Sequence, residues 1–169
     1  MIAIRWYWLG LLGSLTLLAI AYFYFEQHLG LAPCPLCIFQ RVALVGVIFF
    51  CLLGLIFRPK RSGGKWLAFG VTFSSVFGLL IAARQVWLQL LPEDQVPECG
   101  PDLAFMLEAF PFTQMITTVL SGSGECAEVQ WSFLSLSMPA WMVVIFTVMA
   151  LIGLKLLFKK ERTYFSGSR

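Results

Sequence analysis

Residues 38–57 read IFQRVALVGVIFFCLLGLIF, an unbroken apolar run that carries a single charged side chain, Arg41. A helix of about 20 such residues crosses the hydrocarbon core of a bilayer. In lipid only helices and closed barrels satisfy their own backbone polar groups, and a continuous apolar run is typical of a helix. This segment therefore predicts a membrane-spanning helix, which ends where Arg58 and Pro59 follow it.

Three further apolar stretches have the length of a span, at about 6–25, 66–90 and 138–158. Of the 169 residues, 59% are hydrophobic and 12% charged, and the mean hydropathy is +0.83. Soluble domains are about half apolar and a quarter charged, so a soluble protein and a disordered chain are both excluded. The small net charge of +3 does not favour nucleic-acid binding. We predict an all-α membrane protein, a bundle of four transmembrane helices that forms one domain over residues 1–169.

Lys and Arg residues are distributed unevenly between the predicted connections. The connection at 58–65 and the C-terminal tail are rich in them, whereas the connection at 91–137 contains none. Because cytoplasmic loops carry the excess of Lys and Arg, we expect both termini in the cytoplasm. Two loops, at about 26–37 and 91–137, then face outward, and apolar stretches in the longer loop predict that it is partly helical.

Four of the five cysteines fall in these outer loops: Cys34 and Cys37 in the first, Cys99 and Cys126 in the second. The fifth, Cys51, lies inside a span, where a small apolar thiol is ordinary packing. Cysteines confined to the oxidising side favour disulfides, and the four allow three pairings. A zinc site is the alternative, although such sites more often combine two close-spaced pairs.

The motif Cys34-Pro35-Leu36-Cys37 stands at the start of the second span. A helix N-terminus carries partial positive charge, which stabilises a thiolate. Arg41 lies one helical turn after Cys37 on the same face, and its guanidinium is always charged. This pattern predicts a thiolate that reacts with an acceptor dissolved in the lipid, for which a membrane quinone is the obvious candidate. Snorkelling of Arg41 to the headgroups is the alternative.

The second pair, Cys99 and Cys126, lies in turn-rich and flexible surroundings. Cys99 is enclosed by Pro97 and Pro101, and residues 121–124 read SGSG just before Cys126. A disulfide between such segments is accessible to an attacking thiolate. A purely structural bridge that closes the long loop, worth roughly 3–4 kcal/mol, is the alternative.

Together these motifs resemble one family, the disulfide bond formation protein B (DsbB) family of bacterial inner membranes. The resemblance covers nearly the whole chain, with its spans, its outer loops and both cysteine pairs. Its most specific parts are residues 33–37 with Gln40 and Arg41, residues 124–128 with Trp131, and residues 138–141.

The resemblance implies a thiol:quinone oxidoreductase. Such an enzyme reoxidises DsbA, a soluble periplasmic dithiol carrier of the thioredoxin fold, and passes the electrons to ubiquinone or menaquinone. Cys99 matches the cysteine that the carrier attacks, and Cys126 matches its partner, which then engages Cys34. Cys37 matches the thiolate that interacts with the quinone, and Arg41 matches the family's quinone-site arginine. The resemblance also implies a multi-pass protein of the inner membrane, with periplasmic cysteine pairs and no metal.

Arg84 and Gln85 are polar residues near the outer end of the third span. Polar groups in spans face the bundle or a cavity, so we expect both to line a pocket beside Arg41. Some relatives carry a histidine near the quinone where this chain has Gln85. This departure argues against a quinone contact by Gln85.

Two other functions compete with the oxidoreductase. A non-enzymatic four-span protein of the tetraspanin type would have a long outer loop that is cross-linked for structural reasons. It would not need a CxxC motif at a helix start with Arg41 one turn below. An enzyme similar to vitamin K reductase would carry its CxxC late in the bundle instead of at the second span.

Overall fold

The computed structural model describes residues 2–31, 33–57, 61–92, 111, 117 and 124–158. Four of its helices are long and apolar enough to cross a membrane: Ile4–His28, Pro35–Phe57, Gly63–Gln89 and Met138–Phe158. This confirms the predicted all-α bundle of four spans. Large apolar side chains such as Phe49 and Leu80 are more than half exposed, as expected for helices whose outer faces meet lipid.

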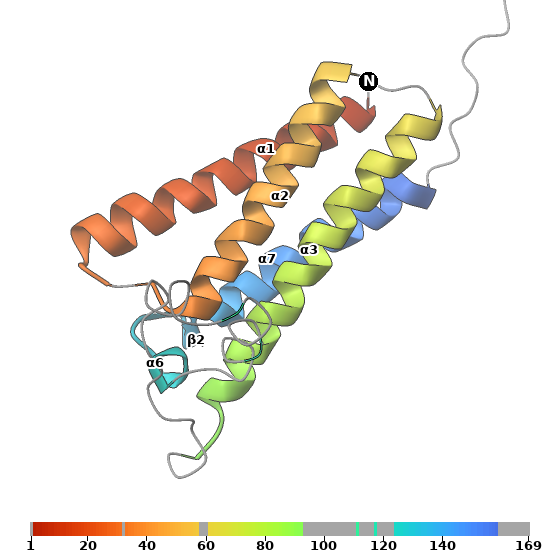
Figure 1. Ribbon diagram of the computed structural model, residues 1–169. Helices are drawn as coiled ribbons and strands as arrows, with labels where there is room; N and C mark the ends of the chain where they lie inside the picture. Colours follow the sequence, from red (N-terminus) through yellow and green to blue (C-terminus); the bar gives the residue numbers. More distant parts are fainter. Residues whose placement is uncertain are drawn as a thin grey trace, which may run out of the picture.

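The first span consists of α1 (Ile2–Ala19), which continues as a π-helix, η1 (Ile20–His28). The other spans are α2 (Pro35–Phe57), α3 (Arg61–Gln89) and α7 (Met138–Phe158). α3 packs along both α2 and α7, and α1 packs mainly against α2. Figure 1 shows that α1 diverges from the other helices toward its C-terminal end, whereas α2, α3 and α7 stay together.

Small residues allow the helices to approach one another closely. A Cβ atom added at Gly46 on α2 would lie 2.7 Å from Ser74 Oγ on α3, and one added at Gly78 would meet the ring of Phe146 on α7. Small residues at such contacts are typical of membrane helices, because association in lipid depends on close packing. Phe146 is fully buried and lies in the central core cluster.

The C-terminal end of the first span extends further along the chain than the sequence predicts. The backbone N–H of Leu29 donates to the Tyr24 carbonyl oxygen at 3.0 Å, so the i→i+5 pattern of a π-helix reaches the end of η1. Glu26 therefore lies on a helix, although the sequence places it at the start of a loop. The positions of the membrane boundaries, and the division into loops at 26–37 and 91–137, stay predictions.

The long connection ends in three short elements. These are the single-turn helix α6 (Gly124–Ala127) and a two-stranded antiparallel hairpin of β1 (Ser132–Phe133) and β2 (Leu136–Ser137). The hairpin turn at Leu134 and Ser135 has φ values of 52° and 63°, as two-residue hairpin loops of type I′ require. Trp141 Nε1 donates to the Phe133 carbonyl oxygen at 3.1 Å, which ties the hairpin to α7.

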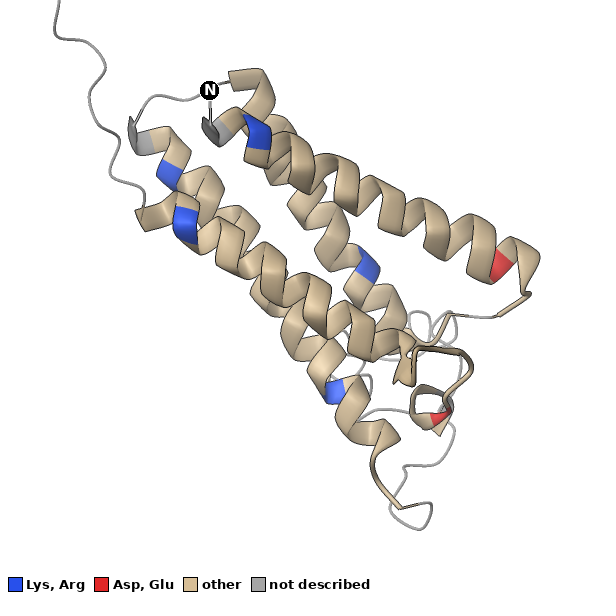
Figure 2. Cartoon of the chain, turned by 180° about the vertical axis from the view of Figure 1, so that it is seen from behind, with Lys and Arg blue, Asp and Glu red and all other residues tan. Residues whose placement is uncertain are grey.

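Charged residues are unevenly distributed along the bundle. Figure 2 shows basic residues at the end that carries the N-terminus, with others further along the helices, and acidic residues at the opposite end. The cysteine pair at the start of α2 lies at this second, acidic end (Figure 1). The distribution agrees with the orientation expected from Lys and Arg, and the orientation itself stays a prediction.

Candidate active site

Cys34 and Cys37 form a close pair of thiols at the start of α2. Cys34 Sγ donates a hydrogen bond to Cys37 Sγ at 2.8 Å, and the Cys37 backbone N–H donates to Cys34 Sγ at 3.3 Å. Cys34 thus takes the place of an N-cap residue, whose side chain accepts one of the unsatisfied N–H groups of the first turn. Pro35 suits the first helical position, so the local sequence itself brings the two sulfurs together.

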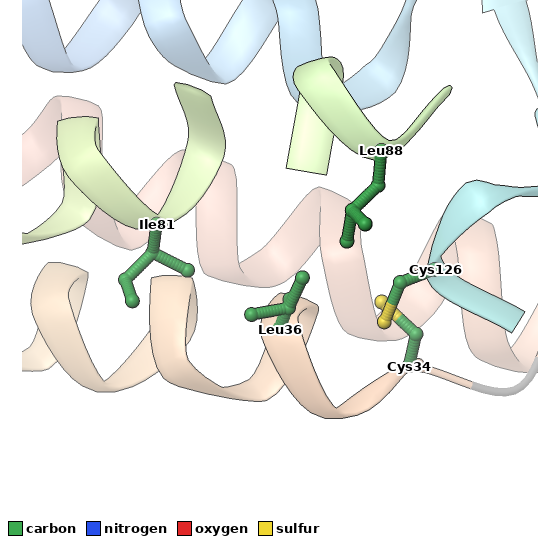
Figure 3. Packing of buried hydrophobic residues seen from close by; sticks show 5 residues of the cluster. All are labelled: Cys34, Leu36, Ile81, Leu88 and Cys126. Carbon is green, nitrogen blue, oxygen red and sulfur yellow. The ribbon is translucent and has the colours of Figure 1, made fainter. Parts of the chain in front are cut away.

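Cys126 reaches this pair from the long connection. It lies on α6 and is 1% exposed, and its side chain packs in one buried cluster with Cys34, which precedes α2, with Leu36 of α2 and with Leu88 of α3. Figure 3 shows the side chains of Cys126 and Cys34 pointing toward each other. Hydrogen bonds to Cys126 and to Cys37, together with burial, raise the pKa of the Cys34 thiol. Cys34 therefore stands between two other sulfurs.

Two glutamines complete the surroundings of the sulfurs. Gln85 Nε2 on α3 lies 3.3 Å from Cys34 Sγ and 3.5 Å from Cys37 Sγ. Gln40 Nε2 on α2 donates to Gln85 Oε1 at 2.8 Å. The sequence analysis considered Gln85 with respect to the quinone and did not predict its contact with the sulfurs.

Arg41 forms an ion pair with Glu26 of η1, so the two helices are linked across the space that opens between them. About a quarter of the Arg41 side chain and a fifth of the Glu26 side chain are exposed. Glu26 is not predicted as a site residue from the sequence, although the sequence contains one signal for it. Glu26 is the only Asp or Glu among the first 92 residues of the chain.

A cavity of about 330 Å³ lies between η1, α2, α7 and the hairpin. Its walls are mostly apolar, and Cys37, Gln40 and Arg41 contribute the polar groups. Trp131 stacks on Phe133 with ring centroids 6.0 Å apart and meets Phe25 edge-on, so aromatic side chains form part of the cavity wall. A mostly apolar pocket of this size with a few convergent polar groups is typical of a small-molecule site.

A second, smaller cavity of about 50 Å³ adjoins the sulfurs and is lined by Cys34, Cys37, Arg41 and Gln85, among others. Gln85 thus lies beside Arg41, as expected. Arg84 is not among the side chains that line either of these two cavities, and its guanidinium lies 4.3 Å from the centre of the Trp87 ring.

Cys99 and Cys51 are the two other cysteines of the chain. Cys99 lies outside the described residues, so its predicted contact with Cys126 stays a prediction. Cys51 is 1% exposed and packs against Tyr7 and Val47 in the core, as expected for a packing thiol. Within the described part of the chain, no group of three His, Cys, Asp or Glu side chains has an arrangement that could hold a metal ion.

Comparison with known proteins decides the family. The family model described as "Disulfide bond formation protein DsbB" matches residues 4–156, which is nearly the whole chain. The chain belongs to the DsbB family. This confirms the resemblance found in the sequence and the class of enzyme that it implied, a thiol:quinone oxidoreductase of disulfide bond formation. With its four apolar helices, this DsbB protein is a multi-pass protein of the inner membrane.

Individual relatives align with this chain over most of their length, and each carries the name "Disulfide bond formation protein B". The protein from Hahella chejuensis is 48% identical over 142 residues, which are 83% of this chain and 84% of the relative. The protein from Nitrosococcus oceani is 46% identical over 155 residues, 90% of either chain. The protein from a Psychrobacter species is 43% identical over 152 residues, 88% of this chain and 87% of the relative.

Proposed function

We propose that this DsbB protein reoxidises a periplasmic DsbA-type dithiol carrier and passes the electrons to a quinone, ubiquinone or menaquinone, in the cavity beside Cys37 and Arg41. One observation carries the proposal. Cys37 belongs to the hydrogen-bonded sulfur pair and also lines the larger cavity, so the sulfur chemistry and the apolar site meet at one residue.

The larger cavity suits a quinone in size and in chemistry. Apolar and aromatic walls accommodate a ring and the start of an isoprenoid tail, and few polar groups are present to hold water. A bound quinone supplies the acceptor for two electrons. Arg41 supplies a fixed cation with planar N–H donors, which stabilises negative charge as it develops on a carbonyl oxygen.

The proposed relay proceeds by attack of a thiolate on a disulfide sulfur. The carrier's thiolate attacks Cys99 of a Cys99–Cys126 disulfide, the bond between these sulfurs breaks, and Cys126 leaves as a thiolate. Cys126 then attacks Cys34 of a Cys34–Cys37 disulfide, and Cys37 leaves as a thiolate. The buried contact between Cys126 and Cys34 supports this second step.

The cycle closes with two further exchanges and the transfer of electrons to the quinone. The carrier's other thiolate displaces Cys99, which bonds again to Cys126 and frees Cys34. The dithiol of Cys34 and Cys37 then loses two electrons and two protons to the quinone and becomes a disulfide. In sum, one carrier dithiol is oxidised and one quinone is reduced to the quinol.

The proposal places the cysteine pairs on the periplasmic face and both termini in the cytoplasm. The excess of Lys and Arg in the connection at 58–65 and in the C-terminal tail supports this orientation. A soluble carrier then meets the long connection from outside the membrane, while the quinone stays within the bilayer.

Anaerobic mixing of the purified protein with a reduced DsbA-type carrier tests the proposal. Without quinone, we expect oxidation of at most about two carriers per protein, one for each disulfide, and then no further reaction. Added quinone should restore continuous turnover. Turnover without any acceptor, or a protein that stops after the first reaction even with quinone present, would contradict the proposal.

A further inference from the structure

Two buried glutamines, Gln40 on α2 and Gln85 on α3, lie beside the cysteine pair, with 5% and 4% of their surfaces exposed. A buried amide without hydrogen bonds costs free energy, and polar side chains within membrane spans are often functional. Both amides are therefore expected to have defined partners. Those partners are the other glutamine and the two sulfurs of the pair.

The contact between the two glutamines determines which way the Gln85 amide points. The Gln85 oxygen accepts a hydrogen bond from Gln40 Nε2 at 2.8 Å and a longer one from the Cys37 thiol at 3.8 Å, so the Nε2 NH₂ group supplies the donors that face the sulfurs. That nitrogen lies 3.3 Å from Cys34 Sγ and 3.5 Å from Cys37 Sγ. An amide NH₂ has two donors, so one group can serve both sulfurs.

We propose that Gln85 is a catalytic residue of the thiol chemistry, which donates a hydrogen bond to whichever sulfur of the Cys34–Cys37 pair carries negative charge. Gln40 is the positioning residue that holds it there. The inference rests on the proposed function, in which negative charge passes between these two sulfurs. A thiolate accepts a charge-assisted hydrogen bond that is much stronger than the bond to a thiol or to a disulfide sulfur.

Two consequences follow from this difference in strength. The Gln85 amide stabilises the thiolate form, which is the nucleophile in every exchange step. It also stabilises the reduced pair relative to the disulfide, and this makes the disulfide form of the pair a stronger oxidant. Arg41 is held by Glu26 of η1, whereas Gln85 contacts both sulfurs directly, so the neutral amide takes this role.

Alkylation of the reduced full-length protein tests the role of Gln85. The protein is treated with iodoacetamide at pH 7 without quinone or carrier, and mass spectrometry follows the modification of Cys37. Gln85→Met keeps most of the side-chain volume but removes the donors. We expect the alkylation rate of Cys37 to fall roughly tenfold, the effect expected from the loss of one hydrogen bond to a charged group. Gln27→Met, the same change at an exposed position of η1 that lines neither cavity, should leave the rate as it is.

The equilibrium between the dithiol and the disulfide of Cys34 and Cys37 provides a second measurement. A purely structural role of Gln85 in packing would not change this equilibrium. In glutathione buffers, Gln85→Met should shift the Cys34–Cys37 pair toward the disulfide by a similar factor. Gln40→Leu should produce a smaller shift in the same direction, since it disturbs only the orientation of Gln85. In the Gln85→Met background, Gln40→Leu should have no further effect, because its action passes through Gln85.

An unchanged alkylation rate and redox equilibrium in folded Gln85→Met would overturn the inference. Helix content measured by circular dichroism shows whether the variant is folded. If it is not, Gln85→Asn carries the test, because a side chain shorter by one methylene withdraws the NH₂ group from the sulfurs. These measurements involve neither carrier nor quinone, so failure of the proposed electron transfer and failure of this inference are separate results.

Discussion

Replacement of Arg41 by methionine removes the cation from the wall of the larger cavity and leaves an apolar side chain. Three quarters of the Arg41 side chain is shielded from solvent, so its charge acts in surroundings of reduced dielectric constant. A hydrogen bond to a charged group contributes about 1.5–3 kcal/mol, and about 1.4 kcal/mol corresponds to a factor of ten. We therefore expect the apparent affinity for quinone to weaken roughly tenfold to hundredfold.

Two further variants separate the charge of Arg41 from its geometry. Arg41→Lys keeps the charge but loses the planar fork of N–H donors, so it should retain part of the affinity. Glu26→Gln removes the charged partner of Arg41 and leaves the cation in the cavity wall. It should weaken the quinone affinity less than Arg41→Met does.

The assay is the initial rate of carrier oxidation as a function of quinone concentration. Only variants with the helix content of the unmodified protein are compared, so that a folding defect does not count as a binding defect. If Arg41 merely anchored the helix at the lipid headgroups, Arg41→Met would lower expression and leave the curve in place. If the dependence of rate on quinone concentration is unchanged in folded Arg41→Met, Arg41 is not part of the active site.

Three further predictions concern topology and the cysteines. A reporter that is active only outside the cytoplasm should work when fused after Cys99 and fail when fused after Lys60; the reverse pattern would refute the orientation. Cys51→Ala should leave carrier oxidation near normal, because a buried thiol without activation is inert, and loss of turnover in a folded variant would show a role beyond packing. Cys99→Ser should abolish reaction with the carrier. The Cys34–Cys37 pair of this variant should still be oxidised by quinone. Normal turnover of that variant would make the second disulfide merely structural.

The four spans could be predicted from the sequence because a membrane helix requires only a continuous run of about 20 apolar residues. The same holds for the start of α2. Cys34, Pro35 and Cys37 are close in sequence, and the first turn of a helix brings their atoms together without help from other segments. Arg41 follows on the same helix, so its place near Cys37 is equally local.

Contacts between helices could not be predicted in this way. The ion pair of Arg41 with Glu26 depends on η1, whose wider turn changes the direction in which its side chains point. The contact of Gln85 with the sulfurs depends on how α3 is rotated and shifted against α2, which close packing at Gly46 and Ser74 helps to determine. The histidine of some relatives at this position points to the quinone, whereas the Gln85 amide of this chain contacts the sulfurs.

The divergence of α1 from the bundle has a consequence for how substrate arrives. The larger cavity is lined by Ala21 of the first span and by Met142 of α7, two helices that hardly touch each other. If this cavity is the proposed quinone site, the quinone would enter it between these two helices, from within the lipid and not from the water phase. The quantity that governs occupancy is then the mole fraction of quinone among the surrounding lipids. Dilution of the membrane with extra phospholipid should slow the enzyme at constant total quinone, and acyl chains become competitors for the same entrance.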